Sequence, residues 1–135
     1  MRYVLKVLIR LASLAIGLVA YMELIVSNWG EKGDANIGAG LLAFLALALV
    51  GLFWAVYDGH QVGALPAVVC WGVVSALFSQ GWLVLRAFSE ADESMSAGEL
   101  MRADAPLIPF TFMLVFIPAV LGAVIGHATR RGTVA

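Results

Sequence analysis

The chain has 135 residues, of which 62% are hydrophobic and 13% are charged, and its formal net charge is -1. Because a soluble domain normally carries about 25% charged residues, this chain has too few to cover a surface that faces water. The composition excludes a soluble enzyme and a disordered tail, and the balanced charge offers no basic surface to nucleic acid. We therefore expect an integral membrane protein in contact with a lipid bilayer.

Four segments are apolar enough to cross a membrane, which requires about 20 residues of helix. Three runs contain no Asp, Glu, Lys or Arg, and a fourth segment, 11–29, is apolar except for Glu23. The charge-free runs are 35–57, 59–85 and 105–129. The expected fold is all-α, a compact bundle of four transmembrane helices in one domain over residues 1–135. The expected spans are about 8–29, 36–57, 62–86 and 105–127.

The first segment also has features of a secretory signal peptide. Arg2, Lys6 and Arg10 form a positive region before the apolar stretch 11–22, as in such peptides. The only small-x-small triplet near it, 15–17, comes too early in the apolar run to be a good cleavage site. We therefore expect this segment to be retained as the first span.

The distribution of basic residues predicts the orientation, because Lys and Arg beside spans are retained in the cytoplasm. Basic residues precede the first span, and Arg130 and Arg131 follow the last one. Both termini are therefore expected to be cytoplasmic, in a multi-pass protein of a bacterial-type plasma membrane. The first loop, with Glu31, Lys32 and Asp34, is expected on the opposite side.

Two further connections are predicted between the spans. Asp58, Gly59 and His60 form the second connection, where Asp-Gly suits a tight turn. The loop 88–104 carries five acidic residues against one arginine and is expected to be extracytoplasmic. Within it, 96–99 fits a helix capping box. This acidic loop is either a solvated connector or a docking surface for an extracytoplasmic partner.

Small residues on one face of a span predict where another helix packs, since they allow close backbone approach in lipid. In the first span this face is expected to point into protein and the opposite, Leu-rich face into lipid. Gly72 marks the third span, and the fourth contains a Gly-xxx-Gly pair. The small residues are Ser13, Gly17 and Ala20 in the first span, and Gly122 and Gly126 in the fourth. Pro118 lies mid-span and is expected to kink the fourth helix, as an accommodated bend or a hinge.

Glu23 is the most informative single residue, because a carboxylate within a span costs at least a few kcal/mol and usually faces protein or water. It lies about 9 Å from the end of the first span at helical rise, and Gln80 lies about 12 Å from the same side. We expect Glu23, Ser79, Gln80 and Arg86 to form an intramembrane polar cluster. Two interpretations stay open: a proton-linked or cation-linked site, or interhelical polar contacts that hold the register.

No pattern in the chain predicts a cofactor, a metal site or catalysis. His60 and His127 lie at span boundaries rather than within spans, so axial haem ligation is not indicated. Cys70 has no second cysteine in the chain. No phosphate-binding glycine loop or nucleophile motif is present. Trp29, Trp54, Tyr57 and Trp82 are expected as anchors at the membrane surface.

Two functions fit these observations. The first is a small non-catalytic subunit that packs against, stabilises or positions other integral membrane subunits of a larger complex. The second is a small transporter or channel built from copies of this chain, in which Glu23 couples to protons or cations. The second function needs polar groups at successive depths, and the cytoplasmic half of the expected bundle offers little beyond Ser13 and Ser75.

Overall fold

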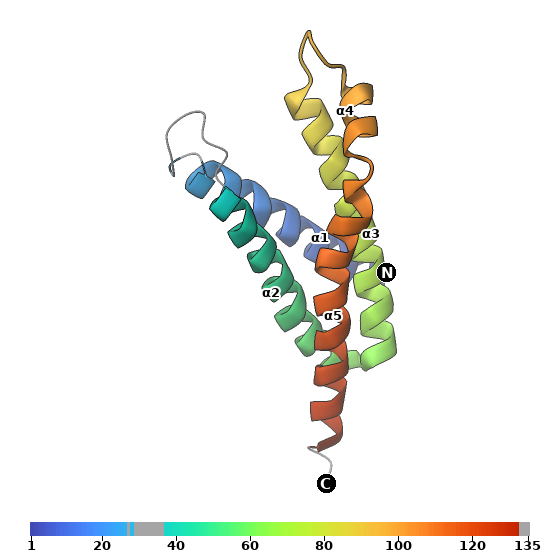
Figure 1. Cartoon of the computed structure of the whole chain (residues 1–135). Helices are drawn as coiled ribbons and strands as arrows, with labels where there is room; N and C mark the ends of the chain where they lie inside the picture. The colour runs from blue at the N-terminus through green and yellow to red at the C-terminus, as the bar shows by residue number, and fades with distance from the viewer. Residues whose placement is uncertain (27, 29–36, 133–135) are drawn as a thin grey trace.

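The computed structural model describes residues 1–26, 28 and 37–132, and within them every regular element is a helix. The expected first loop, with Glu31, Lys32 and Asp34, and the expected anchor Trp29 lie outside the described residues. The elements are α1 (Arg2–Tyr21), the π-helix η1 (Met22–Val26), α2 (Ile37–Val62), α3 (Ala64–Glu90), α4 (Ala97–Asp104) and α5 (Leu107–Gly132). Figure 1 shows their arrangement.

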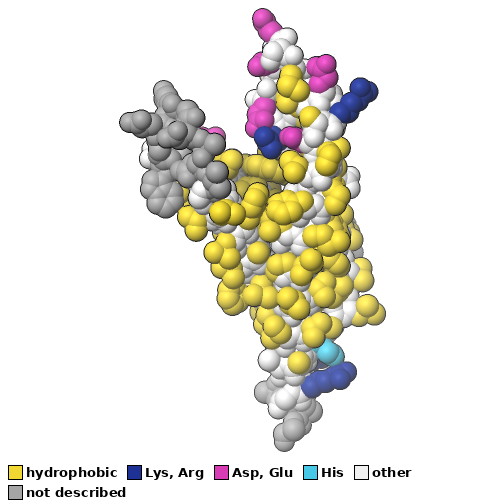
Figure 2. All heavy atoms as spheres, in the orientation of Figure 1, with side chains coloured by type: hydrophobic (Ala, Val, Ile, Leu, Met, Phe, Trp, Pro, Cys, Tyr) yellow, Lys and Arg dark blue, Asp and Glu magenta, His cyan; other side chains and the backbone are white. Residues whose placement is uncertain are grey.

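Among the described residues, four helices are long and apolar enough to cross a membrane, which confirms the predicted all-helical fold with four candidate spans and supports a multi-pass membrane protein. They are Arg2–Ile25, Gly40–Val62, Ala64–Glu90 and Leu107–Gly132. Apolar side chains cover the middle of the molecule in Figure 2, and charged ones gather beyond it over α3 and α4. An apolar girdle between two charged ends is the surface that a bilayer favours.

The two ends of the bundle differ. We call the end that carries α4 the α4 end, and the end with the α2–α3 turn the Gly63 end. In Figure 1, α1 and α2 diverge from α3 and α5 toward the α4 end, whereas α2, α3 and α5 converge toward the Gly63 end. The expected compact bundle is therefore closed at one end and splayed at the other.

Helices α2 and α5 approach each other closely, backbone against backbone, through glycines on both helices. A Cβ added to Gly122 would lie 2.2 Å from the Leu52 carbonyl oxygen, and one added to Gly126 would lie 2.0 Å from that of Val56. On α2, a Cβ at Gly59 would lie 2.2 Å from the carbonyl oxygen of Ala123. The Gly-xxx-Gly pair of α5 is therefore used for packing within the chain. Gly72 of α3 also faces α5, with a hypothetical Cβ 3.4 Å from the Phe116 ring.

The predicted turn at Asp58, Gly59 and His60 is wrong. Helix α2 continues through these residues to Val62, and the reversal occurs at Gly63, whose φ of 95° favours glycine. Gly59 serves the close contact with α5 rather than a turn. Asp58 is 4% exposed, and its carboxylate has hydrogen-bond partners inside the protein.

Within the described chain, the first span does not pack through the small-residue face that the sequence predicts. Leu14 and Leu18 are buried in the core, at 3% and 8% exposure, whereas Ser13 and Gly17 are exposed and Ala20 is half-buried. The side chains of Leu14 and Leu18 are large enough to fill the space between α1 and its neighbouring helices. They pack in the same core cluster as Trp71 and Phe78. The close glycine-mediated contacts belong to α2 and α5 instead.

Helix α4 confirms the predicted capping box. The backbone N–H of Ser96 donates to Glu99 Oε2 at 2.9 Å, and the Ser96 hydroxyl accepts from the Glu99 backbone N–H at 3.4 Å. The Ser96 backbone N–H and hydroxyl lower the pKa of the Glu99 carboxyl. In α5, the helix continues through the half-buried Pro118, and a hinge there stays a prediction.

Candidate functional site

Within the described part of the chain, a buried cluster of charged and aromatic side chains from three helices lies at the Gly63 end. We call Arg10 of α1, Trp54 and Asp58 of α2, and Trp71 of α3 the Arg10 cluster. Arg10 and Asp58 are 5% and 4% exposed, and Trp71 is 0% exposed. A buried pair of opposite charges inside candidate spans is rare and indicates a specific role.

The Asp58 carboxylate accepts hydrogen bonds from two helices. Arg10 Nε donates to Oδ2 at 2.7 Å, and an Nη of the same guanidinium donates to Oδ1. The Trp71 indole N–H donates to Oδ2 at 3.0 Å. This two-bond pairing matches the planar shapes of guanidinium and carboxylate, and the third bond further compensates the burial of Asp58.

The remaining surface of the guanidinium is also occupied. A second Nη donates to the Lys6 carbonyl oxygen at 3.0 Å, and Arg10 Cζ lies 5.3 Å from the centroid of the Trp54 ring. Trp54 meets Trp71 edge-on, with centroids 6.4 Å apart. Trp54 is thus half-buried against the cluster rather than a simple surface anchor. The arrangement fastens α1, α2 and α3 together through one charge pair.

Sequence reasoning missed this cluster because it assigned Arg10 and Asp58 to span boundaries. One signal could have found it. Asp58 is the only charged residue within 35–85, and Trp54 precedes it by one helical turn. A single acid between two long apolar runs needs an opposite charge from elsewhere in the chain. Arg10 offers one, because it directly precedes the apolar segment 11–29.

A second feature is a cavity of about 610 Å³ at the α4 end, between α1 and η1 on one side and α2, α3 and α5 on the other. We call it the α4-end cavity. Its walls are mainly apolar and aromatic, with polar and charged residues among them. The apolar lining residues are Leu18, Val19, Met22, Ala43, Phe44, Leu47, Phe78, Trp82, Leu85 and Leu114, and the others are Glu23, Gly40, Arg86, Ser89, Glu90 and Thr111.

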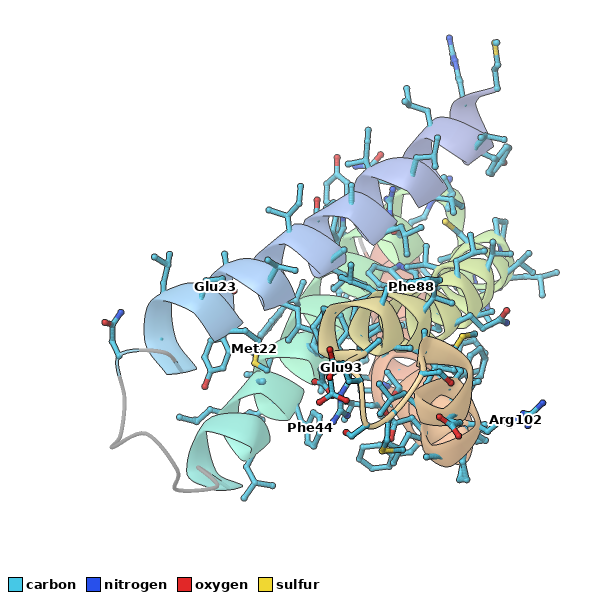
Figure 3. The ribbon with its side chains drawn as sticks, turned by 90° about the horizontal axis from the view of Figure 1, so that it is seen from above. Met22, Glu23, Phe44, Phe88, Glu93 and Arg102 are labelled. Carbon is cyan, nitrogen blue, oxygen red and sulfur yellow. The ribbon has the colours of Figure 1, made fainter. Side chains whose placement is uncertain are left out.

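The structure brings part of the expected polar cluster to this cavity. Glu23 of η1 and Arg86 of α3 both line it. Ser79 is buried, and its hydroxyl donates to the Ala76 carbonyl oxygen of its own helix at 3.1 Å. Gln80, one residue further along α3, is exposed and does not line the cavity. Figure 3 looks down on this end, with Glu23 on η1 and Phe44 on α2.

Arg86 is held in place by two acidic residues. Its Nε donates to Glu90 Oε1 at 3.0 Å, one helical turn along α3, and its Nη1 lies 3.6 Å from Asp104 Oδ2 at the end of α4. The Arg86 and Glu90 side chains are 42% and 51% exposed, so this pair contributes little to stability. The pair holds the charged groups of Arg86 and Glu90 in one position on the cavity wall.

Within the described part of the chain, no three His, Cys, Asp or Glu side chains lie close enough together to hold a metal ion. Buried polar atoms of Ser75 and His127 have no hydrogen-bond partner among the same residues. Ser75 lies on α3 one helical turn from both Trp71 and Ser79. It therefore occupies a level between the Arg10 cluster and the α4-end cavity.

A comparison of the chain with protein-family models, with curated proteins and with solved structures finds no significant match.

Proposed function

We propose that this protein is a small non-catalytic subunit of a larger membrane complex, which packs against partner subunits and stabilises or positions them. In this proposal both termini lie in the cytoplasm, and the α4 end lies outside a bacterial-type plasma membrane. The observation that carries the proposal is the uncovered small-residue face of α1, described next.

The face of α1 around Gly17 is built for close helix packing, yet it has no such contact within the described chain. A Cβ added to Gly17 would have nothing within 4 Å, and Ser13 beside it is exposed. This face lines a groove of about 170 Å³ between α1 and α2. On α2 and α5, by contrast, small residues are covered by a neighbouring helix. A partner helix in the groove would cover the α1 face in the same way.

The charges of the protein support a structural role. Both oxygens of Asp58 accept hydrogen bonds from Arg10, and Oδ2 also accepts one from Trp71. Arg86 is paired with Glu90 and Asp104. Groups held in this way fix helices in place and have few lone pairs or protons left for chemistry.

The test is purification of the tagged chain from its native membrane in a mild detergent, followed by mass measurement of the intact complex. We expect a defined complex with at least one larger membrane protein. Gly17→Leu is expected to remove that protein from the complex. Gly81→Leu is the matched control, because a Cβ at Gly81 also has nothing within 4 Å but lies on α3. A chain that purifies alone, or only with copies of itself, contradicts the proposal.

A second candidate function, a homo-oligomeric transporter, is favoured by a separate observation. The Arg10 cluster brings charged groups into the Gly63 half of the bundle, where the sequence predicts little polarity. With Ser75 and the α4-end cavity, polar groups then occur at several depths. Reconstitution of the purified chain in vesicles tests this function: proton or cation flux that Glu23→Gln abolishes supports it, and absence of flux contradicts it.

A further inference from the structure

We infer that Arg10 and Asp58 are positioning residues for the groove between α1 and α2, which we call the α1–α2 groove. Their ion pair sets how far apart the two walls of this groove stand, and it thereby controls binding of a partner helix that it does not contact. The inference rests on the proposed function for the occupant of the groove. The width of the groove is a property of the chain itself and is tested without the partner.

The α1–α2 groove continues directly from the ion pair along both helices. On α1, Ser13 and Gly17 follow Arg10 by three and seven residues, so that all three lie along one helix face. On α2, Val50 precedes Asp58 by eight residues and shares a face with it in the same way. Ser13, Gly17 and Val50 line the groove. The pair therefore bounds the groove at its Gly63 end.

Small residues on the two walls do not themselves keep the walls apart. Gly17 of α1 and Ala46 of α2 both line the groove, and a Cβ added to Gly17 would have nothing within 4 Å. Such residues allow helices in lipid to approach closely. Leu14 and Leu18 hold α1 in the apolar core, but apolar packing is non-directional. A directional contact is needed to keep α1 at one distance from α2.

The ion pair supplies that directional contact. Arg10 Nε donates to Asp58 Oδ2 at 2.7 Å, and an Nη donates to Oδ1. Two parallel hydrogen bonds between planar groups define both the distance and the angle between the helices that carry them. The Trp71 indole N–H donates to Oδ2 at 3.0 Å and restrains the carboxylate from α3. Gly17 lies only about 10 Å along α1 from Arg10 at helical rise, so a shift of the pair moves the groove wall.

The first test measures the groove in the purified full chain, in micelles of dodecyl maltoside. Spin labels are attached at Ile16→Cys and Leu45→Cys in a chain with Cys70→Ala. Ile16 of α1 and Leu45 of α2 are 68% and 54% exposed and do not line the groove, so the labels leave it free. Electron paramagnetic resonance gives the distribution of distances between the labels. We expect one narrow distribution while the ion pair is intact.

Two variants then alter the pair. Arg10→Met with Asp58→Leu removes both charges and keeps apolar side chains in their place, an exchange that often leaves stability unchanged or raised. Arg10→Lys keeps the charge but loses the planar fork. Both are expected to broaden the label distances and shift them to shorter values, as α1 approaches α2 through its small residues. Arg86→Gln with Glu90→Gln is the matched control, because this pair lies on α3 and does not border the groove.

The second test recovers the native complex through the tagged chain. The double variant and Arg10→Lys are each expected to retain at least about fivefold less partner than the unmodified chain. Thermal unfolding of the same samples separates positioning from stability. If the pair contributed stability alone, partner recovery would follow the unfolding temperature, and the double variant would retain more partner than Arg10→Met by itself.

A narrow, unshifted distance distribution in the double variant would overturn the inference, because the groove would then keep its width without the pair. Partner recovery that follows stability would overturn it as well. An unmodified chain that purifies without any partner contradicts the proposed function instead, and the label distances still decide whether the pair sets the groove.

Discussion

Arg10 and Asp58 form a buried ion pair although they are 48 residues apart in the chain. The pair joins α1 to α2, and the Trp71 indole N–H adds α3. In the low dielectric of a protein interior, each of two facing charges is stable only while the other is present. The pair therefore fixes how α1, α2 and α3 are aligned along one another at the Gly63 end of the bundle.

The first prediction concerns this pair. Arg10→Met and Asp58→Leu are each expected to lower the free energy of unfolding by about 3–5 kcal/mol, because each leaves one charge buried without its partner. The double variant is expected to lose less than either single variant, which corresponds to a coupling of at least about 3 kcal/mol. Thermal unfolding in detergent, followed by tryptophan fluorescence, measures all three.

The Arg86–Glu90 pair supplies the control for that experiment. Its side chains are 42% and 51% exposed, so Arg86→Met is expected to cost less than about 1 kcal/mol. Losses at Arg10 and Asp58 that simply add in the double variant would show that the two residues act independently, contrary to the structure.

A second prediction concerns the close contact of α2 and α5. Gly126→Ala is expected to destabilise the protein by about 1–3 kcal/mol, because the new Cβ would lie 2.0 Å from the Val56 carbonyl oxygen and the backbones must move apart. Gly81→Ala adds the same methyl group where nothing lies within 4 Å. It is expected to be neutral or slightly stabilising, since alanine is the better helix former. The same unfolding assay compares them, and equal losses would contradict the packing.

The sequence predicts the four spans well, because charge-free runs of sufficient length have few alternatives in a chain this apolar. It does not predict where α2 ends. A boundary at Asp58 assumes that a charge stays out of a span, and this assumption fails once Arg10, far away in the chain, neutralises it. Such a partner is visible only when the helices are placed in three dimensions.

Helix faces were harder to predict than spans. Small residues show that a face can be approached closely, but not which helix approaches it. In this chain the glycines of α5 are covered by α2, whereas Gly17 of α1 is left open and Leu14 fills the core instead. The α4-end cavity was beyond prediction for a similar reason. It arises from the divergence of helix pairs, and no local pattern encodes that divergence.

A third prediction follows from the capping box of α4. Hydrogen bonds from Ser96 lower the pKa of Glu99, so the cap stabilises α4 above the ordinary glutamate pKa and is lost as pH falls through the lowered value. Amide hydrogen exchange of Ala97–Asp104, corrected for the intrinsic effect of pH, is expected to show less protection at about pH 3 than at about pH 6. Glu99→Gln keeps an acceptor and is expected to abolish most of this pH dependence. An unchanged dependence would mean that another acid controls α4.

The last prediction tests the orientation on which the proposed function depends. The basic residues beside the spans predict that the Gly63 end is cytoplasmic, since Arg130 and Arg131 lie in the last turn of α5. In a chain with Cys70→Ala, a cysteine at Ser94 in the acidic loop is expected to react with a membrane-impermeant maleimide applied to intact cells. A cysteine at Gln61, exposed near the α2–α3 turn, is expected to react only after the membrane is opened. The reverse pattern would place the α4 end of the bundle in the cytoplasm and would contradict the proposed orientation.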